Sequence, residues 1–172
     1  MSLQAVDRMQ KPILIAGAAG MVAAAPAQSE ELQATFEIPR LEASNYRKPY
    51  VAIWLEDADR KMVETYAVHF KQSPIGDNWL PDLKTWWRRG GRAMKMSASG
   101  ISRPTRSPGK YTIGLGSLND LPPGKYALVV EAVRENGGRE IIKAPFDWTR
   151  GKPVAASAQG ASELGRVSIT TG

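Results

Sequence analysis

LPPGKYALVVEAV, residues 121–133, carries the clearest structural signal in the chain. Its first four residues contain a Pro-Pro-Gly corner, and the residues after Tyr126 are the aliphatic and β-branched types that favour an extended strand. In a tyrosine corner, the tyrosine hydroxyl hydrogen-bonds to the chain a few residues upstream and fixes the turn before a late strand of a β-sandwich. We therefore expect residues 121–133 to form such a corner followed by a strand.

Strand-like runs occur on both sides of this stretch. They are short, rich in β-branched and aromatic residues, and separated by turns that contain Pro and Gly. The runs cover residues 34–41, 48–56, 61–70, 91–98, 110–116, 125–133, 139–148 and 163–170. In the second run, apolar residues occupy both alternating sets of positions, so both faces of that strand should be covered. Small residues over 151–162 predict a linker before the last strand.

One segment, NWLPDLKTWWRRGG over residues 78–91, departs from the strand pattern. Pro81 suits a first helical turn, Leu83 and Trp87 have helical spacing, and a glycine pair ends the run. We expect one short helix here, covering an open end of the sheets. With the strands, it predicts an all-β fold, an immunoglobulin-like or fibronectin-like antiparallel β-sandwich with one short helix.

The beginning of the chain has the pattern of an export signal. Basic residues precede an apolar run over residues 13–25, and small residues flank the expected cleavage point after Ala27. This predicts a secretory signal peptide over residues 1–27 and a single β-sandwich domain over residues 28–172. The apolar run is shorter than the ~20 residues that span a bilayer, and no later segment approaches that length. We expect a periplasmic protein without a transmembrane segment in its mature chain.

Positive charge is concentrated in one stretch. The formal net charge is +6, and residues 84–110 include no acidic residue. The basic residues of this stretch, called the basic zone below, are Lys84, Arg88, Arg89, Arg92, Lys95, Arg103, Arg106 and Lys110. Because export argues against nucleic acid, the zone indicates phosphate-bearing small molecules, anionic lipid or acidic proteins, with a merely solvated surface as the alternative.

The basic zone predicts an anion-binding or partner-binding face. This face comprises Arg88, Arg89, Arg92, Arg103 and Arg106, with Trp86 beside them. Trp86, as the exposed member of the Trp86-Trp87 pair, would offer a ring on which a ligand stacks. The alternative is that these tryptophans only fill the core.

The residue types of common catalytic and metal sites are scarce. His69 is the only histidine and falls in a strand-like run, and the chain has no cysteine. Ser107 and Lys110 have the spacing of a serine nucleophile and its lysine, but a Pro-Gly pair between them forces a turn where that motif begins a helix. We expect no enzymatic activity, no metal site and no disulfide.

Four stretches together resemble domain-of-unknown-function family 2271. In chain order they are WLEDAD at 54–59, WLPDLKTWWR at 79–88, RSPGKYT at 106–112 and PPGKYALVVEAVRENGG at 122–138. The resemblance extends over nearly the whole mature chain. It implies a small exported immunoglobulin-like domain of the kind often encoded near flavin-transferring enzymes, PepSY-type membrane proteins and iron-uptake genes.

Many relatives carry an element similar to a flavinylation motif at the position of MSASGISRPT, residues 96–105. In that motif, the last hydroxyl receives FMN through a phosphoester bond. The resemblance implies Ser102 as the acceptor, with Ser99 and Gly100 as the preceding motif residues. Met96 and Ile101 stand where the motif has Asp and Ala, and both departures weaken the match. An FMN at Ser102 would have its phosphate neutralised by the neighbouring basic residues Arg103, Arg106 and Lys110.

These observations leave three functions open. The first is a non-enzymatic periplasmic accessory or binding module without a cofactor, associated with an extracytoplasmic redox or iron-uptake system. Its partner would be a protein of the cell envelope or an anionic ligand. The second is an electron-transfer domain that carries covalent FMN on Ser102. The third is a structural protein of the cell envelope.

Overall fold

The computed structural model describes residues 31–96 and 100–171. The predicted signal peptide and its cleavage point after Ala27 lie outside these residues, and so does Ser99. No helix in the described part of the chain is long and apolar enough to cross a membrane.

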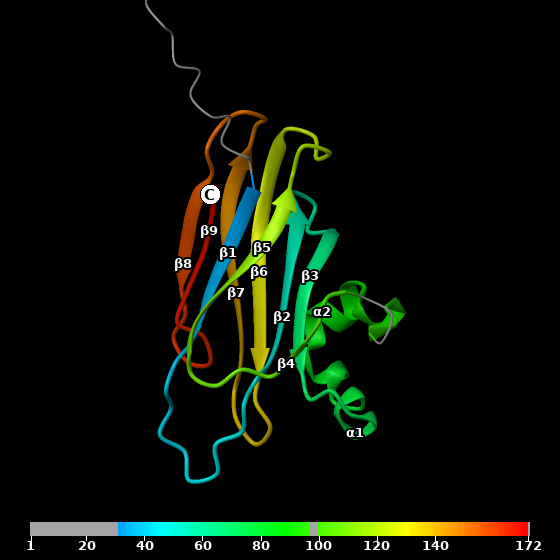
Figure 1. Ribbon diagram of the computed structural model, residues 1–172, viewed down its shortest axis with the longest axis vertical. Helices are drawn as coiled ribbons and strands as arrows, with labels where there is room; N and C mark the ends of the chain where they lie inside the picture. Colours follow the sequence, from blue (N-terminus) through cyan, green and yellow to red (C-terminus); the bar gives the residue numbers. More distant parts are fainter. Residues whose placement is uncertain (1–30, 97–99, 172) are drawn as a thin grey trace, which may run out of the picture.

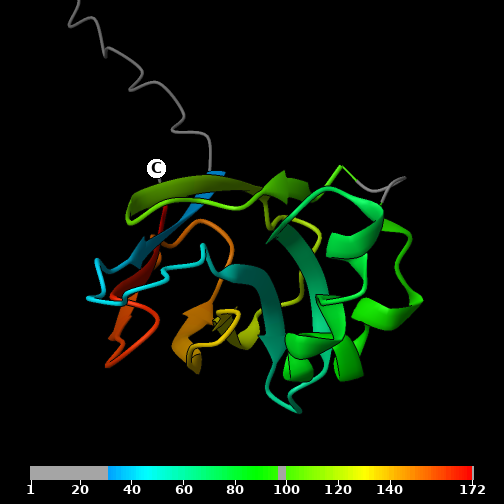
Figure 2. The ribbon, with the colours of Figure 1, turned by 90° about the horizontal axis from the view of Figure 1, so that it is seen from below.

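Two β-sheets pack face to face (Figure 1, Figure 2). The four-stranded sheet has the order β5-β1-β9-β8, with β1 (Glu31–Ile38), β5 (Gly109–Ser117), β8 (Ala155–Gln159) and β9 (Arg166–Thr171). The five-stranded sheet has the order β4-β3-β2-β6-β7, with β2 (Tyr50–Asp57), β3 (Met62–Phe70), β4 (Ser102–Pro104), β6 (Gly124–Val133) and β7 (Arg139–Trp148). The pairs are antiparallel except for β3 with β4, which run parallel. The all-β sandwich predicted from the sequence is confirmed.

Strand β2 is buried on both faces. Val51, Ile53 and Leu55 belong to the core between the two sheets, whereas Ala52 and Trp54 belong to a second apolar cluster on the other side of the five-stranded sheet. Successive side chains of a strand point to opposite faces, which is why one continuous apolar run supplies both clusters. The prediction that both faces of this strand are covered is confirmed.

The tyrosine corner before β6 is also confirmed. The hydroxyl of Tyr126 donates a hydrogen bond to the carbonyl oxygen of Pro122 at 2.8 Å. The Tyr126 ring lies 6.1 Å from the Phe146 ring of β7, measured between centroids, so the corner also contributes to packing. The narrower immunoglobulin-like assignment, for which this corner was the sequence evidence, stays a prediction.

A layer of short helical segments covers the outer face of the five-stranded sheet, beside β3 (Figure 2). This helical layer comprises α1 (Pro74–Asp77), η1 (Leu80–Asp82), α2 (Lys84–Arg89) and η2 (Gly91–Ala93). The helix predicted over 78–91 is present as η1 and α2. The expectation that it covers an open end of the sheets is wrong. It covers the outer face of the five-stranded sheet, where burial removes the outward apolar side chains of β2, β3 and β6 from water.

Two segments differ from the sequence-based prediction. The strand predicted over 91–98 is not found in the described part of that segment, because residues 91–93 form η2 and Met96 packs into the cluster under the helical layer. The linker predicted over 151–162 contains β8, which pairs with β9. Ladder hydrogen bonds stabilise β8 despite its small side chains, and Ala156 and Ala158 still pack against the core.

Candidate functional site

The basic zone is continuous in sequence but divided in the structure. One part lies in and just after the helical layer and contains Lys84, Arg88, Arg89, Arg92 and Lys95. The other part lies in β4, in β5 and between them, and contains Arg103, Arg106 and Lys110. The loop after β4 leads away from α2 to the start of β5 (Figure 1). The predicted binding face is therefore not carried by a single element.

Arg89 neutralises a buried carboxylate. Its guanidinium lies 3.2 Å from Oε1 of Glu56, whose side chain is only 2 % exposed. Glu56 also pairs with Lys143 and accepts a hydrogen bond from the indole of Trp54. A buried carboxylate needs such partners. The charge of Arg89 is thus engaged in holding α2 against β2.

Glu131 of β6 fixes the beginning of α2 in a related way. Its carboxylate accepts hydrogen bonds from the backbone N–H groups of Thr85 and Trp86, at 3.1 and 2.8 Å. It also forms an ion pair with Arg139 of β7 at 2.7 Å. The residue before α2, Leu83, provides no side-chain cap. The sheet therefore supplies the hydrogen-bond acceptor that the first turn of this short helix lacks.

Trp86 is fully buried, so the prediction of an exposed ring at this position is wrong. Its indole N–H donates to the Thr65 hydroxyl at 3.1 Å, and Gly91 packs directly on the ring. Residues three apart in a helix share a face, which places Trp86 on the same side as Leu83, against the sheet. Trp79 is instead the exposed tryptophan, at 49 %.

The other arginines of the predicted face make only local contacts. Arg88 donates to the carbonyl oxygen of Lys84 at 3.0 Å, and Arg103 donates to that of Gly100 at 2.8 Å. Arg106 lies over the Tyr111 ring, 5.3 Å from its centroid. Arg88, Arg92, Arg103 and Arg106 form no ion pair with any described residue. They remain available to an anion, from the helical layer and from the segment that contains β4.

Ser102, the acceptor implied by the flavinylation motif, begins β4 and is half-buried. Its hydroxyl donates to the carbonyl oxygen of Met96 at 2.6 Å. Ile101 packs against the cluster under the helical layer, and its carbonyl accepts from the backbone N–H of Val68 at 2.9 Å. Gly100 is exposed, and a Cβ at this position would meet nothing. The Ser102 hydroxyl and Ile101, one of the two residues that depart from the motif, thus both hold this edge of the sheet.

His69 is a core residue at 2 % exposure. Its Nδ1 lies 3.0 Å from the carbonyl oxygen of Pro104, so Nδ1 carries the proton of the neutral ring. Burial lowers the pKa of His69, and the positive charges of Arg106 and Arg103 add to this effect. The residues that the structure describes include no group of His, Cys, Asp or Glu side chains that could hold a metal ion.

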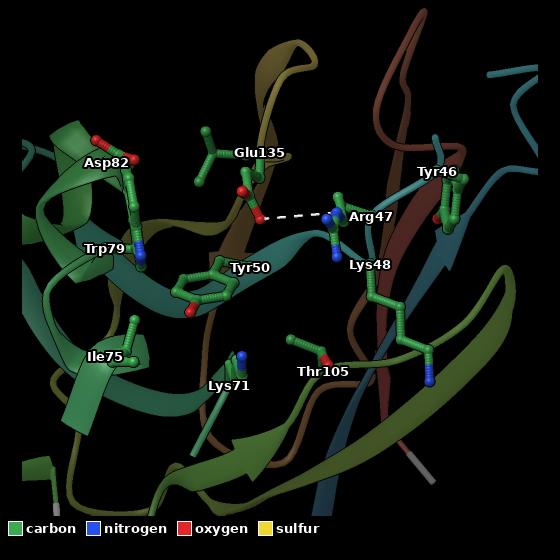
Figure 3. Close-up of a pocket in the computed structure, with 11 residues that line it drawn as sticks. Tyr46, Arg47, Lys48, Tyr50, Lys71, Ile75, Trp79, Asp82, Thr105 and Glu135 are labelled. Atoms are coloured by element: carbon green, nitrogen blue, oxygen red, sulfur yellow. Dashed lines mark ion pairs between the residues drawn. The ribbon is translucent and has the colours of Figure 1, made fainter. Parts of the chain in front are cut away.

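A groove of about 640 Å³, which no sequence pattern predicted, lies where the helical layer meets the ends of β2 and β3 (Figure 3). Its lining comes from segments far apart in the chain: the loop before β2, the residue after β3, α1, η1, the residue after β4 and the end of β6. Pockets of this size hold small-molecule ligands in many proteins.

One side of the groove is apolar and aromatic. Ile75 of α1 and Trp79 form this side and are exposed at 66 % and 49 %. The ring of Tyr50 lies between them and the opposite side (Figure 3). Its hydroxyl donates to the carbonyl oxygen of Gly76 at 3.2 Å, which connects β2 to α1. Burial raises the pKa of Tyr50, so the ring is neutral near pH 7.

Charged side chains line the rest of the groove. Arg47 lies 4.0 Å from Glu135, and both side chains are about half exposed. Lys48 and Lys71 also line the groove, and neither forms an ion pair within the described residues. Asp82 is the remaining charged lining residue. Three cations against two carboxylates leave the groove with one excess positive charge.

Comparison with known protein families identifies the family of this chain. A family model described as "Predicted periplasmic protein (DUF2271)" matches residues 31–166, which confirms the resemblance drawn from the sequence. No curated protein and no solved structure matches the chain.

Proposed function

The chain belongs to this family of predicted periplasmic proteins, and we propose that it is a non-enzymatic binding module, exported by its signal peptide, whose ligand site is the groove of Figure 3. The observation that carries the proposal is the groove itself, which combines exposed aromatic and aliphatic side chains with lysines that have no carboxylate partner among the residues that the structure describes. Small-molecule sites commonly have this composition, apolar walls with a few convergent polar groups.

The groove is a better candidate than the basic zone that the sequence favoured. Arg89 is engaged by Glu56, Trp86 is inside the core, and the remaining cations of the zone are divided between the helical layer and the segment from β4 to β5. We also propose that this binding module acts as an accessory protein of a redox or iron-uptake system in the cell envelope.

NMR mapping tests the proposed function. The ¹⁵N-labelled protein would be titrated with a small-molecule extract of the periplasm, and backbone amide and indole shifts would be followed. We expect shifts at residues 46–50, 71–79 and 133–135, around the groove. Shifts restricted to residues 84–92 and 103–110 would favour the basic zone instead. No shifts at all would contradict a small-molecule site and favour a structural role in the envelope.

FMN on Ser102 is the second candidate. One observation favours it: Arg103 is exposed, is next to Ser102, and has no ion pair with a described residue. The hydrogen bond from Ser102 to Met96 would have to break before the hydroxyl could take up a phosphoester bond. Intact mass after co-expression with a flavin transferase tests this function. A gain of one FMN less water, absent from Ser102→Ala, would support it, and an unchanged mass would rule it out.

A further inference from the structure

We propose that the groove binds a small organic monoanion with a flat apolar body, such as an aromatic carboxylate or phosphate ester with a single negative charge. The body would lie against Tyr50 and Trp79, and the anionic group would lie near Lys71 and Lys48. The inference rests on the proposed function, because it specifies the ligand of the same groove.

The size of the groove sets the first limit. A volume of about 640 Å³ lies within the range of roughly 300–1,000 Å³ typical of sites for small organic ligands. It is larger than an inorganic anion requires. The ligand must therefore have a body as well as a charged group.

The apolar side indicates what this body is. Among the described residues, the large apolar side chains that are exposed are Val63, Ile75 and Trp79, and two of these line the groove. Exposed apolar surface concentrated at one concave place is typical of a binding site, whereas scattered exposure is ordinary. Tyr50 adds a neutral aromatic ring between the two sides (Figure 3). Aromatic side chains favour a flat apolar partner on which they can stack.

The charges indicate the anionic group. Arg47 is partly neutralised by Glu135, whereas Lys71 and Lys48 have no ion pair in the part of the chain that the structure describes. The carboxylates of Glu135 and Asp82 reduce the excess positive charge to one. A monoanion matches that excess, while a cationic ligand would increase it.

The apolar side chains and the cations lie on different sides of the groove. Figure 3 shows Ile75 and Trp79 on one side of Tyr50, with Arg47 and Lys48 on the other. Lys71 and Thr105 complete the rim near Tyr50, and the Thr105 hydroxyl is a further hydrogen-bond donor for an anionic oxygen. The ligand would accordingly lie across Tyr50, its body toward α1 and its charge toward β4.

Two dyes with the same ring system test the ligand class. 1-Anilinonaphthalene-8-sulfonate is a monoanion, and N-phenyl-1-naphthylamine is its neutral counterpart. Fluorescence titration of the folded protein should show saturable binding of the anionic dye, weakened by salt. We expect Lys71→Met to weaken the anionic dye about five- to tenfold and the neutral dye little. Trp79→Ala should weaken both dyes about tenfold.

Matched variants outside the groove serve as controls. Lys152→Met removes an exposed lysine elsewhere, and Val63→Ala removes an exposed apolar side chain elsewhere; neither should change dye affinity. Equal affinities for both dyes, with Lys71→Met inert, would overturn the monoanion proposal while the groove remained a binding site. Binding of neither dye, or anionic-dye binding insensitive to both Lys71→Met and Trp79→Ala, would overturn the groove and the proposed function together.

Discussion

The basic zone and the groove differ in how the chain assembles them. The zone lies in one continuous stretch, in which Arg89 neutralises Glu56 and the neighbouring Trp86 fills the cluster under the helical layer. The groove collects side chains from separate segments, and within residues 31–96 and 100–171 Lys48, Lys71 and Trp79 make none of the ion pairs or apolar core contacts that stabilise the fold. A conspicuous local stretch of sequence can thus serve the fold, whereas the side chains of a binding site can come from distant segments that only the tertiary structure brings together.

Two tryptophans give the largest expected contrast between these regions. Trp86→Ala should lower the free energy of unfolding by about 4 kcal/mol, because it leaves a large cavity and removes the hydrogen bond from the indole to Thr65. Trp79→Ala should change it by less than about 0.5 kcal/mol. Urea unfolding followed by far-ultraviolet circular dichroism measures both. Similar losses for the two variants would contradict the division into a structural and a binding region.

Glu131 should show the next largest effect. Glu131→Ala leaves two backbone N–H groups of α2 and the Arg139 guanidinium without their acceptor, so we expect a loss of about 3 kcal/mol in the free energy of unfolding. Glu135→Ala, at the exposed carboxylate of the groove, is the matched control and should cost less than about 0.5 kcal/mol. A small loss for Glu131→Ala would show that α2 docks without this contact.

His69 makes the stability dependent on pH. Since burial lowers its pKa in the folded protein, the unfolded chain binds a proton near its ordinary pKa of about 6.5 that the folded protein does not bind. Stability due to the neutral ring is complete above that pH and falls as the pH drops toward the folded pKa, by up to about 1.4 kcal/mol per pH unit. Urea unfolding at pH 7.5 and 5.5 should show a steeper loss for the wild type than for His69→Gln. Equal slopes would disprove this role.

Two neighbouring arginines sharpen the comparison within the basic zone. Arg89→Met removes a partner of the buried Glu56 and should cost about 1 kcal/mol, because Lys143 and Trp54 still serve the carboxylate. Arg88→Met, in the same helix, should cost less than about 0.3 kcal/mol because its contact is local and exposed. Thermal unfolding of both variants distinguishes them, and a reversed order would mean that the ion pair contributes nothing.

Much of the sandwich was predictable from local patterns. The alternation in β2 and the Pro-Pro-Gly corner at Tyr126 report strand faces and a turn, and both depend only on neighbouring residues. The inward orientation of Trp86 was not predictable in this way. Residues three and four apart can both lie on one helical face, so Trp87 fitted the spacing of a core position as well as Trp86 did. Strand β8 carries small residues whose pairing with β9 is a tertiary fact.

The candidate site was less predictable than the fold. Lys48 and Lys71 are separated by the β2-β3 hairpin, and only the antiparallel pairing of Val51 with His69 brings the two residues to the same end of the sheet. Thr105 lies near them because β4 pairs in parallel with β3. A strand of only three residues has too short a pattern to be predicted from the sequence. The exposure of Trp79 was the one signal that indicated the groove, and this exposure can be recognised only when the position of the helical layer is known.

The capping of α2 by Glu131 has a consequence for the order of folding. An isolated helix of six residues is unstable, and this one obtains its hydrogen-bond acceptors from a strand 45 residues further along the chain. We therefore expect the helical layer to form only after β6 has paired with β2. Substitutions in the layer should accelerate unfolding and leave the refolding rate nearly unchanged, so that the rim of the groove is the first part of the protein to open.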